Sequence, residues 1–600
     1  MPHDFLAGRG KPWEHDPGPP GGSDWARLFA ETPNYRGLGK AVLGREKFRW
    51  HFGPMFYRGR LGDGDVRVLV IGQEGAQDES LGHRSFIGGT GARMQHFLHH
   101  IGITRSYLFL NTFVYPINGQ YDGAKLRWLA QSPDSPIARH RQAILDHVLA
   151  RNDLRLVVAV GVAAKESVVS WVEAHGGSCP AGAEDVSRCD GSVLKKKLRI
   201  VGVRHPGGAG KGGSTAAIIA DFKKAIGQIE DWSSADGHWL PPDAGSERLP
   251  AASYKYKSAP IPLHDLPYGT PWRVGQGGTS SNRKDAQRSI QMFSEAGKYG
   301  ASVKYSSDAK GSPEGYDQET GDVPYEPPKR SFLDFDPGPG PQFERLLMGG
   351  EPGLEWPDFS ALGVKVHPSF GYGPIYRGRP ARATVLVLAD QDSHDDLFTG
   401  RALTGEGGQR LQELLRAMGV TKSYAIIRVL PVDTLDLATA TVDAVVDDAR
   451  VRALHAAIVE RVVAASSTAL ALVISPRAAR LAGHVLPADL PRVKMKAWGE
   501  SGALADWRKA LGTVKTIEYE KDIASPEFEY AGARGQIPRI DLPYGTLRWQ
   551  GTSGDRAVRA RAGTKPSADY FKVCMPQWAF DKVAEPLSAA EEAAVEKAPT

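Results

Sequence analysis

The chain carries one long segment twice, and this internal repeat constrains its fold more than any other feature. Three short motifs recur in the same order: DPGP at Asp16 and Asp336, YRGR at Tyr57 and Tyr376, and DLPYGT at Asp265 and Asp541. The interval between copies falls from 320 residues for DPGP to 276 for DLPYGT, mainly because the first copy carries an insertion between Val162 and Arg199. A repeat of this kind in a chain of 600 residues predicts two domains with the same fold.

The repeat and the local composition together predict the domain boundaries. We expect a first domain over residues 1–275, a linker over 276–330 rich in Gly, Ser, Lys and Pro, a second domain over 331–550 and a tail over 551–600. Each domain ends in an extended strap that contains DLPYGT and is expected to pack on its own domain. The Ala- and Glu-rich end after Pro586 predicts a frayed helix or a disordered tail.

Apolar segments alternate with helical patterns along the first copy. Continuously apolar runs predict buried strands at residues 66–71, 107–110, 154–160 and 198–203. Apolar residues at helical spacing predict helices around 94–101, 163–171 and 217–226. Alternation of this type is typical of an α/β fold in which helices cover a mainly parallel sheet on both faces. We therefore expect two tandem three-layer domains.

Composition excludes several classes of protein. Hydrophobic residues make up 41% and charged residues 24% of the chain, which is ordinary for a globular protein. No run of 18 apolar residues predicts a membrane span, and the N-terminus lacks the pattern of a signal peptide. Cys179, Cys189 and Cys574 are too few for a disulfide framework or a four-cysteine cluster, so we expect free thiols and a cytoplasmic protein. A net charge of +5 permits nucleic-acid binding without arguing for it.

Polar residues follow three of the predicted strands in the first copy. Glu74, Asn111 and His205 each come directly after a strand or end one, and the carboxyl ends of parallel strands meet at one edge of a sheet. An acid, an amide and an imidazole at one edge suit recognition of a polar ring and cleavage of a bond with charge assistance. The second copy has other residues at these positions: Gln391, Arg428 and Ala497.

These motifs resemble those of the uracil-DNA glycosylase superfamily. GQEGA at 72–76 resembles its water-activating motif, which reads GQDPY in the best-known branch, and LFLNT, HPGG and FIGGTGARMQHFL resemble its base-reading, HPS and base-stacking segments. The resemblance covers about residues 50–230 and, degraded, about 370–515. It implies duplex or single-stranded DNA as partner, with one base flipped out, and no metal, cofactor, membrane or obligate protein partner.

The resemblance implies catalytic roles for three residues. Glu74 would stabilise an oxocarbenium-like sugar or activate water, His205 would stabilise the anionic leaving base, and Gln73 would help through its backbone N–H. Asp78 and Glu79 are rival carboxylates. Plainer roles stay open: Glu74 as an acid at a helix N-terminus, and His205 as a loop histidine satisfied by backbone.

Four further residues are implied in base binding. Gly72 opens the motif, and Phe86 would stack on the flipped base unless it is simply core. Asn111 offers a donor and an acceptor, so it can read uracil or, with the amide turned over, cytosine; it could also cap a turn. Ala76 stands where GQDPY has tyrosine, which leaves room beside C5 of a pyrimidine.

The glycine-rich run after His205 predicts contact with DNA phosphates. Gly207 and Gly208 offer backbone N–H groups and Lys211 a positive charge. A P-loop is excluded, because the run lacks the Ser or Thr that must follow the lysine. The run also lacks the apolar wedge with which the best-known branch opens a duplex.

Three functions remain open from the sequence. The first is a monofunctional DNA glycosylase acting on a modified pyrimidine with a bulky C5 group, such as glucosylated hydroxymethylcytosine of phage DNA, in anti-phage defence. The second is a repair glycosylase that excises uracil, and the third is a non-catalytic DNA- or base-binding module. The second copy, with Leu403 near the position of Phe86, predicts binding or architecture; retained chemistry through Asp390 or Asp392 is a minor alternative.

Overall fold

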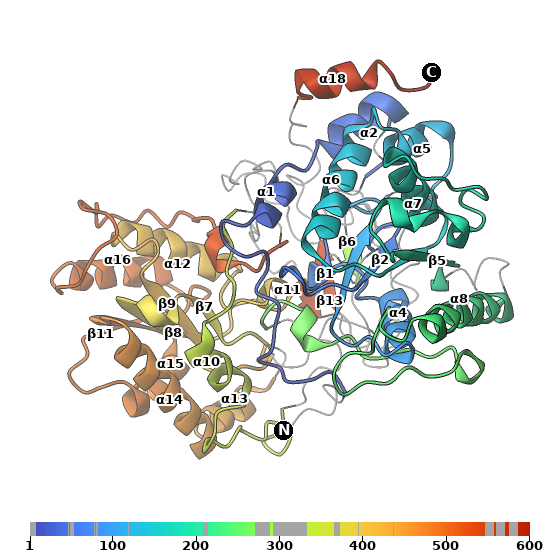
Figure 1. The fold of residues 1–600 in the computed structure, drawn as a ribbon. Coiled ribbons are helices and arrows are strands. Elements are labelled where there is room, and N and C mark those ends of the chain that lie inside the picture. Colours follow the sequence, from blue (N-terminus) through green and yellow to red (C-terminus); the bar gives the residue numbers. More distant parts are fainter. Residues whose placement is uncertain are drawn as a thin grey trace.

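The structure is a computed structural model that places two α/β lobes side by side (Figure 1). It describes the following residues: 8–45, 47–48, 53–76, 79, 82–117, 119–207, 214–269, 289–291, 333–364, 373–393, 395–435, 437–546, 557–559, 571–574 and 586–600. Each lobe is built on a five-stranded, mostly parallel sheet. The mixed α/β class predicted from the sequence is therefore confirmed. In the described part of the chain, no helix combines the length and the apolar character needed to cross a membrane.

The first lobe is built on a sheet with strand order β1-β3-β2-β4-β5. Its strands are β1 (Arg58–Gly59), β2 (Val68–Gly72), β3 (Tyr107–Asn111), β4 (Leu156–Val160) and β5 (Arg199–Val203). All neighbours are parallel except β1, which runs antiparallel to β3. The four apolar runs of the sequence thus form the four parallel strands, whereas β1 is too short to leave a periodic signal.

Helices pack on both faces of the first sheet (Figure 1). They are α1 (Asp24–Ala30), α2 (Tyr35–Leu43), α4 (Gly89–His100), α5 (Ala124–Gln131), α6 (Pro136–Arg151), α7 (Val162–Ala174) and α8 (Thr215–Ala235). Alternate strand residues face opposite sides: Leu69 and Ile71 share a core with α1, α2, α5, α6 and α7, while Val68 and Val70 share one with α4 and α8. Sequence patterns predicted α4, α7 and the first half of α8, but not α5 and α6.

The second lobe is built on a sheet with strand order β11-β10-β8-β9-β7. Its strands are β7 (Tyr376–Gly378), β8 (Val385–Ala389), β9 (Tyr424–Arg428), β10 (Leu470–Ile474) and β11 (Arg492–Met495). Its helices are α10 (Pro341–Glu344), α11 (Asp395–Thr399), α12 (Glu406–Ala417), α13 (Thr439–Val446), α14 (Ala449–Ala465), α15 (Pro476–Val485) and α16 (Ala503–Val514). Strand order and directions repeat those of the first lobe, with only the edge strand β7 antiparallel.

The two DLPYGT straps each contact both lobes. Asp265 accepts from Arg58 Nη1 of its own lobe at 2.8 Å, and Asp541 accepts from Arg377 Nη1 of its own lobe at 2.9 Å. Three residues later each strap crosses over: Tyr268 lies in the core of the second lobe, and Tyr544 lies in the core of the first. The straps therefore join the lobes reciprocally in addition to packing where the sequence places them.

The insertion of the first lobe contains a disulfide, so the prediction of free thiols is wrong for its two cysteines. Cys179 and Cys189 are bonded, with Cα atoms 4.1 Å apart. Asp185 caps a short 3-10 turn by accepting from the backbone N–H of Ser187, and the backbone N–H of Asp190 donates to the carbonyl of Ser178. These turns fold the loop back on itself, which a count of cysteines does not reveal.

The end of the chain forms a docked helix instead of the frayed or disordered tail expected from composition. Helix α18 (Ala589–Val595) begins with a capping box between Ser588 and Glu591 and lies beside α2 (Figure 1). Glu591 Oε1 also accepts from the backbone N–H of Asn34 at 2.8 Å, and Leu587 packs against the first core. These contacts hold the end of the tail on the first lobe.

A third, antiparallel sheet joins the linker to the tail. It consists of β6 (Ser289–Gln291), β12 (Ala557–Arg559) and β13 (Phe571–Cys574), with β13 in the centre. The rest of the predicted linker from 276 to 330 lies outside the described residues.

Candidate functional site

The candidate residues emerge at one edge of the first sheet. Gly72, the last residue of β2, lies opposite Asn111, the last residue of β3. On the other side of β2, strands β4 and β5 end together, and the backbone N–H of Gly161 donates to the carbonyl of Val203 at 2.9 Å. Gln73, Glu74 and His205 follow these strand ends, so the parallel sheet brings the acid, the amide and the imidazole to the same edge.

Phe86 and Asn111 meet at Gly72. A Cβ atom on Gly72 would lie 2.3 Å from Cζ of Phe86 and 2.6 Å from Oδ1 of Asn111, so only glycine fits there. The Phe86 ring is 7% exposed, and its centroid lies 5.0 Å from that of Phe109. An aromatic ring, which is also part of the core with Val70 and Phe109, and an amide thus lie together at the sheet edge.

Phe86 has a constrained backbone. Its φ is 56°, in the left-handed region that residues with a side chain rarely adopt. Its carbonyl oxygen would lie 1.6 Å from a Cβ on Gly91, so a glycine is required at that position of α4. The surrounding contacts must hold this conformation, because strain of this kind persists only where the structure over-determines it.

The amide of Asn111 is oriented by Ser85. Asn111 is 5% exposed, and its Nδ2 donates to Ser85 Oγ at 3.3 Å. The Ser85 hydroxyl itself donates to the carbonyl of Met55 at 2.8 Å, so it can only accept from the amide. In the described part of the chain, Asn111 Oδ1 is buried without a hydrogen-bond partner. A buried acceptor of this kind suits a donor on a ligand.

Glu74 accepts a hydrogen bond from its neighbour Gln73 and acts electrostatically on Lys47. Gln73 Nε2 donates to Glu74 Oε2 at 3.0 Å, and the Gln73 carbonyl accepts from the backbone N–H of Phe113 at 2.9 Å. Lys47 is 5% exposed; burial lowers the pKa of its ammonium, while the charges of Asp122 and Glu74 oppose this shift. Sequence patterns did not mark Lys47, since it precedes the first strand and belongs to no motif.

Glu79, one of the rival carboxylates, holds the loop that carries Phe86. Its Oε1 accepts from the backbone N–H groups of Ile87 at 3.0 Å and Gly88 at 2.9 Å, and its Oε2 accepts from that of Ala76 at 2.8 Å. Both oxygens are therefore engaged inside the protein, and Ala76 is tied to this loop. Asp78, the other rival, lies outside the described residues.

His205 is exposed at the same sheet edge, and one of its ring nitrogens accepts a hydrogen bond from the backbone. The backbone N–H of Gly207 donates to His205 Nδ1 at 3.1 Å. In the neutral imidazole, Nδ1 is then the acceptor, and the proton lies on Nε2. The next residue, Pro206, is held through its carbonyl by Tyr256 Oη at 2.8 Å and Arg93 Nη1 at 3.3 Å. Gly208 and Lys211, which are predicted to contact DNA phosphates, lie outside the described residues.

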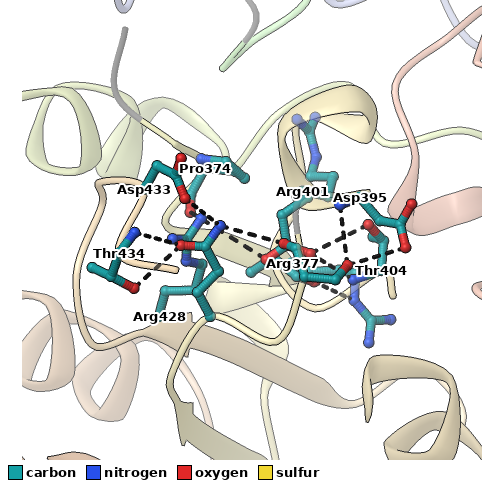
Figure 2. Close-up of polar contacts among 12 residues, drawn as sticks. Pro374, Arg377, Asp395, Arg401, Thr404, Arg428, Asp433 and Thr434 are labelled. Atoms are coloured by element: carbon teal, nitrogen blue, oxygen red, sulfur yellow. Dashed lines mark hydrogen bonds and ion pairs between the residues drawn. The ribbon is translucent and has the colours of Figure 1, made fainter. Parts of the chain in front are cut away.

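The second lobe fills the corresponding place with an arginine (Figure 2). Arg428 ends β9 as Asn111 ends β3, and it is 1% exposed. Its Nη1 donates to the carbonyl of Pro374 at 3.1 Å and its Nη2 to that of Val432 at 2.8 Å. Burial lowers the pKa of this guanidinium, and the charge of the Asp396 carboxylate opposes that lowering. The side chain thus bonds inside its own lobe.

The second-lobe residues equivalent to Glu74, Phe86 and His205 also differ from them in chemistry or in contacts. Gln391, the counterpart of Glu74, accepts from the backbone N–H of Thr434 at 2.8 Å and donates to Asp433 at 3.2 Å. Leu403 has a φ of 51° and its carbonyl lies against Gly408, so it matches Phe86 in conformation but not in chemistry. In the sheet register, Met495 takes the position that Val203 has in the first lobe. Ala497 therefore occupies the position equivalent to His205.

Asp390 and Asp392 are the two residues through which the second lobe could retain chemistry, and Asp392 is hydrogen-bonded to the backbone. Its Oδ2 accepts from the backbone N–H of Gly407 at 2.7 Å. The pKa of Asp390 is raised, chiefly because the carboxyl is buried. Within the described ranges, no group of three or more His, Cys, Asp and Glu side chains could hold a metal ion.

One comparison with known proteins finds a match. The family model described as the uracil DNA glycosylase superfamily matches residues 60–223. This segment contains β2 to β5 and every candidate residue of the first lobe, and it is similar to a superfamily of DNA glycosylases that act on DNA. The match covers less than half of the chain and none of the second lobe. No curated protein matches the chain.

Proposed function

We propose that the chain is a monofunctional DNA glycosylase whose active site lies at the edge of the first sheet. One observation carries the proposal: the Phe86 ring and the buried Oδ1 of Asn111 converge on Gly72, inside the segment matched by the superfamily model. A flipped pyrimidine would fill this place, with its face on Phe86 and a donor of its edge on Asn111 Oδ1, either the N3–H of uracil or the 4-amino group of a cytosine.

The reaction is hydrolysis of the N-glycosidic bond. Water supplies the oxygen that bonds to C1′, the C1′–N bond breaks, and the electron pair of that bond leaves with the base. Glu74 stabilises the positive charge on the sugar or takes a proton from the water. His205 donates from Nε2 to an oxygen of the base and stabilises its negative charge. The proton released by water ends on the base, and an abasic site remains.

The preferred substrate is a pyrimidine with a bulky C5 substituent. Ala76 stands where the best-known branch has a tyrosine, and its smaller side chain supports the proposal of room beside C5. Its backbone N–H donates to Glu79, which fixes the position of this residue in the loop. Glucosylated hydroxymethylcytosine of phage DNA has such a substituent, and its excision would serve anti-phage defence. Uracil is the second candidate, because the matching family model carries that base in its description.

We infer a different role for the second lobe. The lobes correspond to three-layer domains over residues 1–275 and 331–550, and the second is a degenerate copy of the first. Its pocket position is filled by Arg428, whose guanidinium bonds to carbonyls of its own lobe. It extends the DNA-binding surface or clamps the duplex, without cleaving a bond.

An excision assay tests the proposal. Purified protein is incubated with matched duplex and single-stranded oligonucleotides that carry uracil, cytosine, 5-hydroxymethylcytosine or its glucosylated form, and abasic sites are revealed by alkali. We expect cleavage at the glucosylated base, slowed by about a hundredfold or more in Glu74→Gln and strongly slowed in His205→Ala. Cleavage at uracil alone supports the repair alternative. Wild-type DNA binding without cleavage at any base, unchanged in both variants, would establish the non-catalytic binding module.

A further inference from the structure

We propose that the strap of the second lobe positions the base pocket of the first, with Tyr544 and Arg84 as positioning residues. This inference rests on the proposed function for the identity of the pocket, and it adds a role for the second lobe within that site. The observation behind it is a chain of contacts from Tyr544 to Asn111.

The first step of the chain joins the strap to Arg84. Arg84 is completely buried, and its Nη1 donates to the carbonyls of Tyr544 and His83, each at 2.9 Å. Its Nε donates to Asp16 Oδ2 at 2.6 Å. Burial opposes the charge of Arg84, yet Asp16 raises its pKa above the usual value, so the guanidinium stays charged. A buried charge with these partners has one favourable position.

The strap also packs against the first lobe through its apolar surface. The Tyr544 ring is 2% exposed and lies among aromatic rings of the first core, with its centroid 6.1 Å from those of Phe29 and Phe56. The next residue, Gly545, has a φ of 90°, and a Cβ there would lie 2.8 Å from Cβ of His83. The strap therefore touches the loop that leads to the pocket through both side chain and backbone.

The second step joins Arg84 to the pocket through its two following residues. Ser85 donates its backbone N–H to the carbonyl of Tyr57 at 3.0 Å, and its hydroxyl orients the amide of Asn111. Phe86 holds its left-handed conformation directly after Ser85. Because Arg84, Ser85 and Phe86 are consecutive, a displacement of Arg84 moves both the ring and the hydroxyl that define the pocket.

The second lobe contains the same arrangement with the lobes exchanged. Arg401 Nε donates to Asp336 Oδ2 at 2.6 Å, and its Nη1 donates to the carbonyl of Tyr268 at 2.8 Å. Tyr268 is 2% exposed, like Tyr544. Here, however, Arg401 is followed by Ala402 and Leu403, whose side chains carry no polar group. The contact between Arg401 and the strap of the first lobe is therefore an internal control for the contact between Arg84 and the strap of the second lobe.

Two matched variants of the full chain test the inference. Tyr544→Ala and Tyr268→Ala each remove one buried ring from the junction of strap and lobe. Single-turnover excision is measured on the best substrate, and hydrogen exchange is measured over residues 82–88 and 399–405. We expect Tyr544→Ala to slow excision by about tenfold or more and to accelerate exchange in 82–88, because small displacements of reacting groups are costly. Tyr268→Ala should change the rate by less than about twofold and accelerate exchange only in 399–405.

Equal losses of activity in the two variants, or unchanged exchange over 82–88 in Tyr544→Ala, would overturn the inference. Thermal unfolding of both variants shows whether each is folded, and Tyr544→Phe, which keeps the ring, should behave like wild type. If the wild-type protein excises no base, the proposed function fails. The exchange measurement still decides whether the second strap orders the loop of the first lobe.

Discussion

Asn111 donates through Nδ2 to Ser85 Oγ, and among the described residues its amide oxygen is left buried without a hydrogen-bond partner. An asparagine with a freely turning amide reads a donor or an acceptor equally well. Here the Ser85 hydroxyl donates its hydrogen bond to the carbonyl of Met55, so it can only accept from Asn111, and this disfavours the turned amide. In the proposed site, Oδ1 would therefore accept from a donor of the base, the N3–H of uracil or the 4-amino group of a cytosine.

Removal of this hydroxyl should relax base selectivity. In Ser85→Ala the amide of Asn111 loses its orienting partner, so both orientations become available. We expect the ratio of excision rates for the best and second-best pyrimidines to fall by about fivefold to tenfold, in line with the loss of one buried hydrogen bond. Rates on paired oligonucleotides measure this ratio. Ser135→Ala, at a buried serine that bonds to the carbonyl of Leu129, is the control and should leave it unchanged.

The two described carboxylates of the loop should respond differently to loss of charge. Glu74→Gln is expected to lower the single-turnover rate by about a hundredfold or more with little change in the melting temperature. Glu79→Gln weakens three bonds to backbone N–H groups, so it should lower the unfolding free energy by about 1–3 kcal/mol. Rates and thermal melts separate the effects. A Glu79→Gln protein that melts like wild type would contradict the assigned role of Glu79.

Enlarging Ala76 should discriminate between substrates. Ala76→Tyr introduces a ring at the place proposed for the C5 substituent, so excision of a bulky C5-modified pyrimidine should fall by more than about tenfold relative to a pyrimidine with hydrogen at C5. Competition between two labelled oligonucleotides in one reaction measures the ratio. Ala76→Ser, which adds only an oxygen atom, is the matched control. An equal decrease on both substrates would show that Ala76 does not face C5.

Asp243 should contribute stability that depends on pH. Its burial raises the pKa, but the backbone N–H groups of Thr104, Arg105 and Ser106 all donate to its carboxylate, and the pKa falls to about 2. Because the folded pKa lies below the unfolded one, the stabilisation is complete above the unfolded value of about 4 and is lost as the pH falls toward 2.

Thermal melts from neutral pH to pH 2 measure this contribution. Asp243→Asn should melt below wild type at neutral pH, and the two proteins should converge as the pH falls through this window. Asp522 makes the same three backbone contacts in the second lobe, so Asp522→Asn is the matched variant. A difference that persists at the acid end of the range would contradict the assignment.

Local patterns were enough to locate the parallel strands and their polar ends. Glu74, Asn111 and His205 reach one edge because parallel strands begin and end together, and this follows from strand direction alone. Contacts made by partners distant in sequence were not visible in this way. Arg84 and Tyr544 are 460 residues apart; Arg84 belongs to no motif, and the DLPYGT motif that contains Tyr544 does not by itself reveal a contact with the first lobe. The recurrence of DPGP and DLPYGT in both copies was the available clue, because in each lobe a buried arginine binds the aspartate of DPGP and the tyrosine carbonyl of the other lobe's DLPYGT.

Composition was misleading where a loop or a tail is ordered by specific contacts. Cys179 and Cys189 were expected as free thiols, but the turns of the insertion bring them together. The last helix was expected to be frayed, but Glu591 both caps that helix and bonds to Asn34. Each outcome depends on one or two hydrogen bonds with defined geometry, and these do not follow from residue frequencies.

The order of the residues predicted a repeated α/β architecture and the sheet edge at which the first copy gathers its polar groups, because both depend on short-range periodicity and strand direction. The orientation of the Asn111 amide, the engagement of Glu79 in the loop and the crossing of each strap to the opposite lobe emerged only in the folded chain. They depend on which buried donors meet which acceptors, and that pairing is set when segments far apart in sequence pack together.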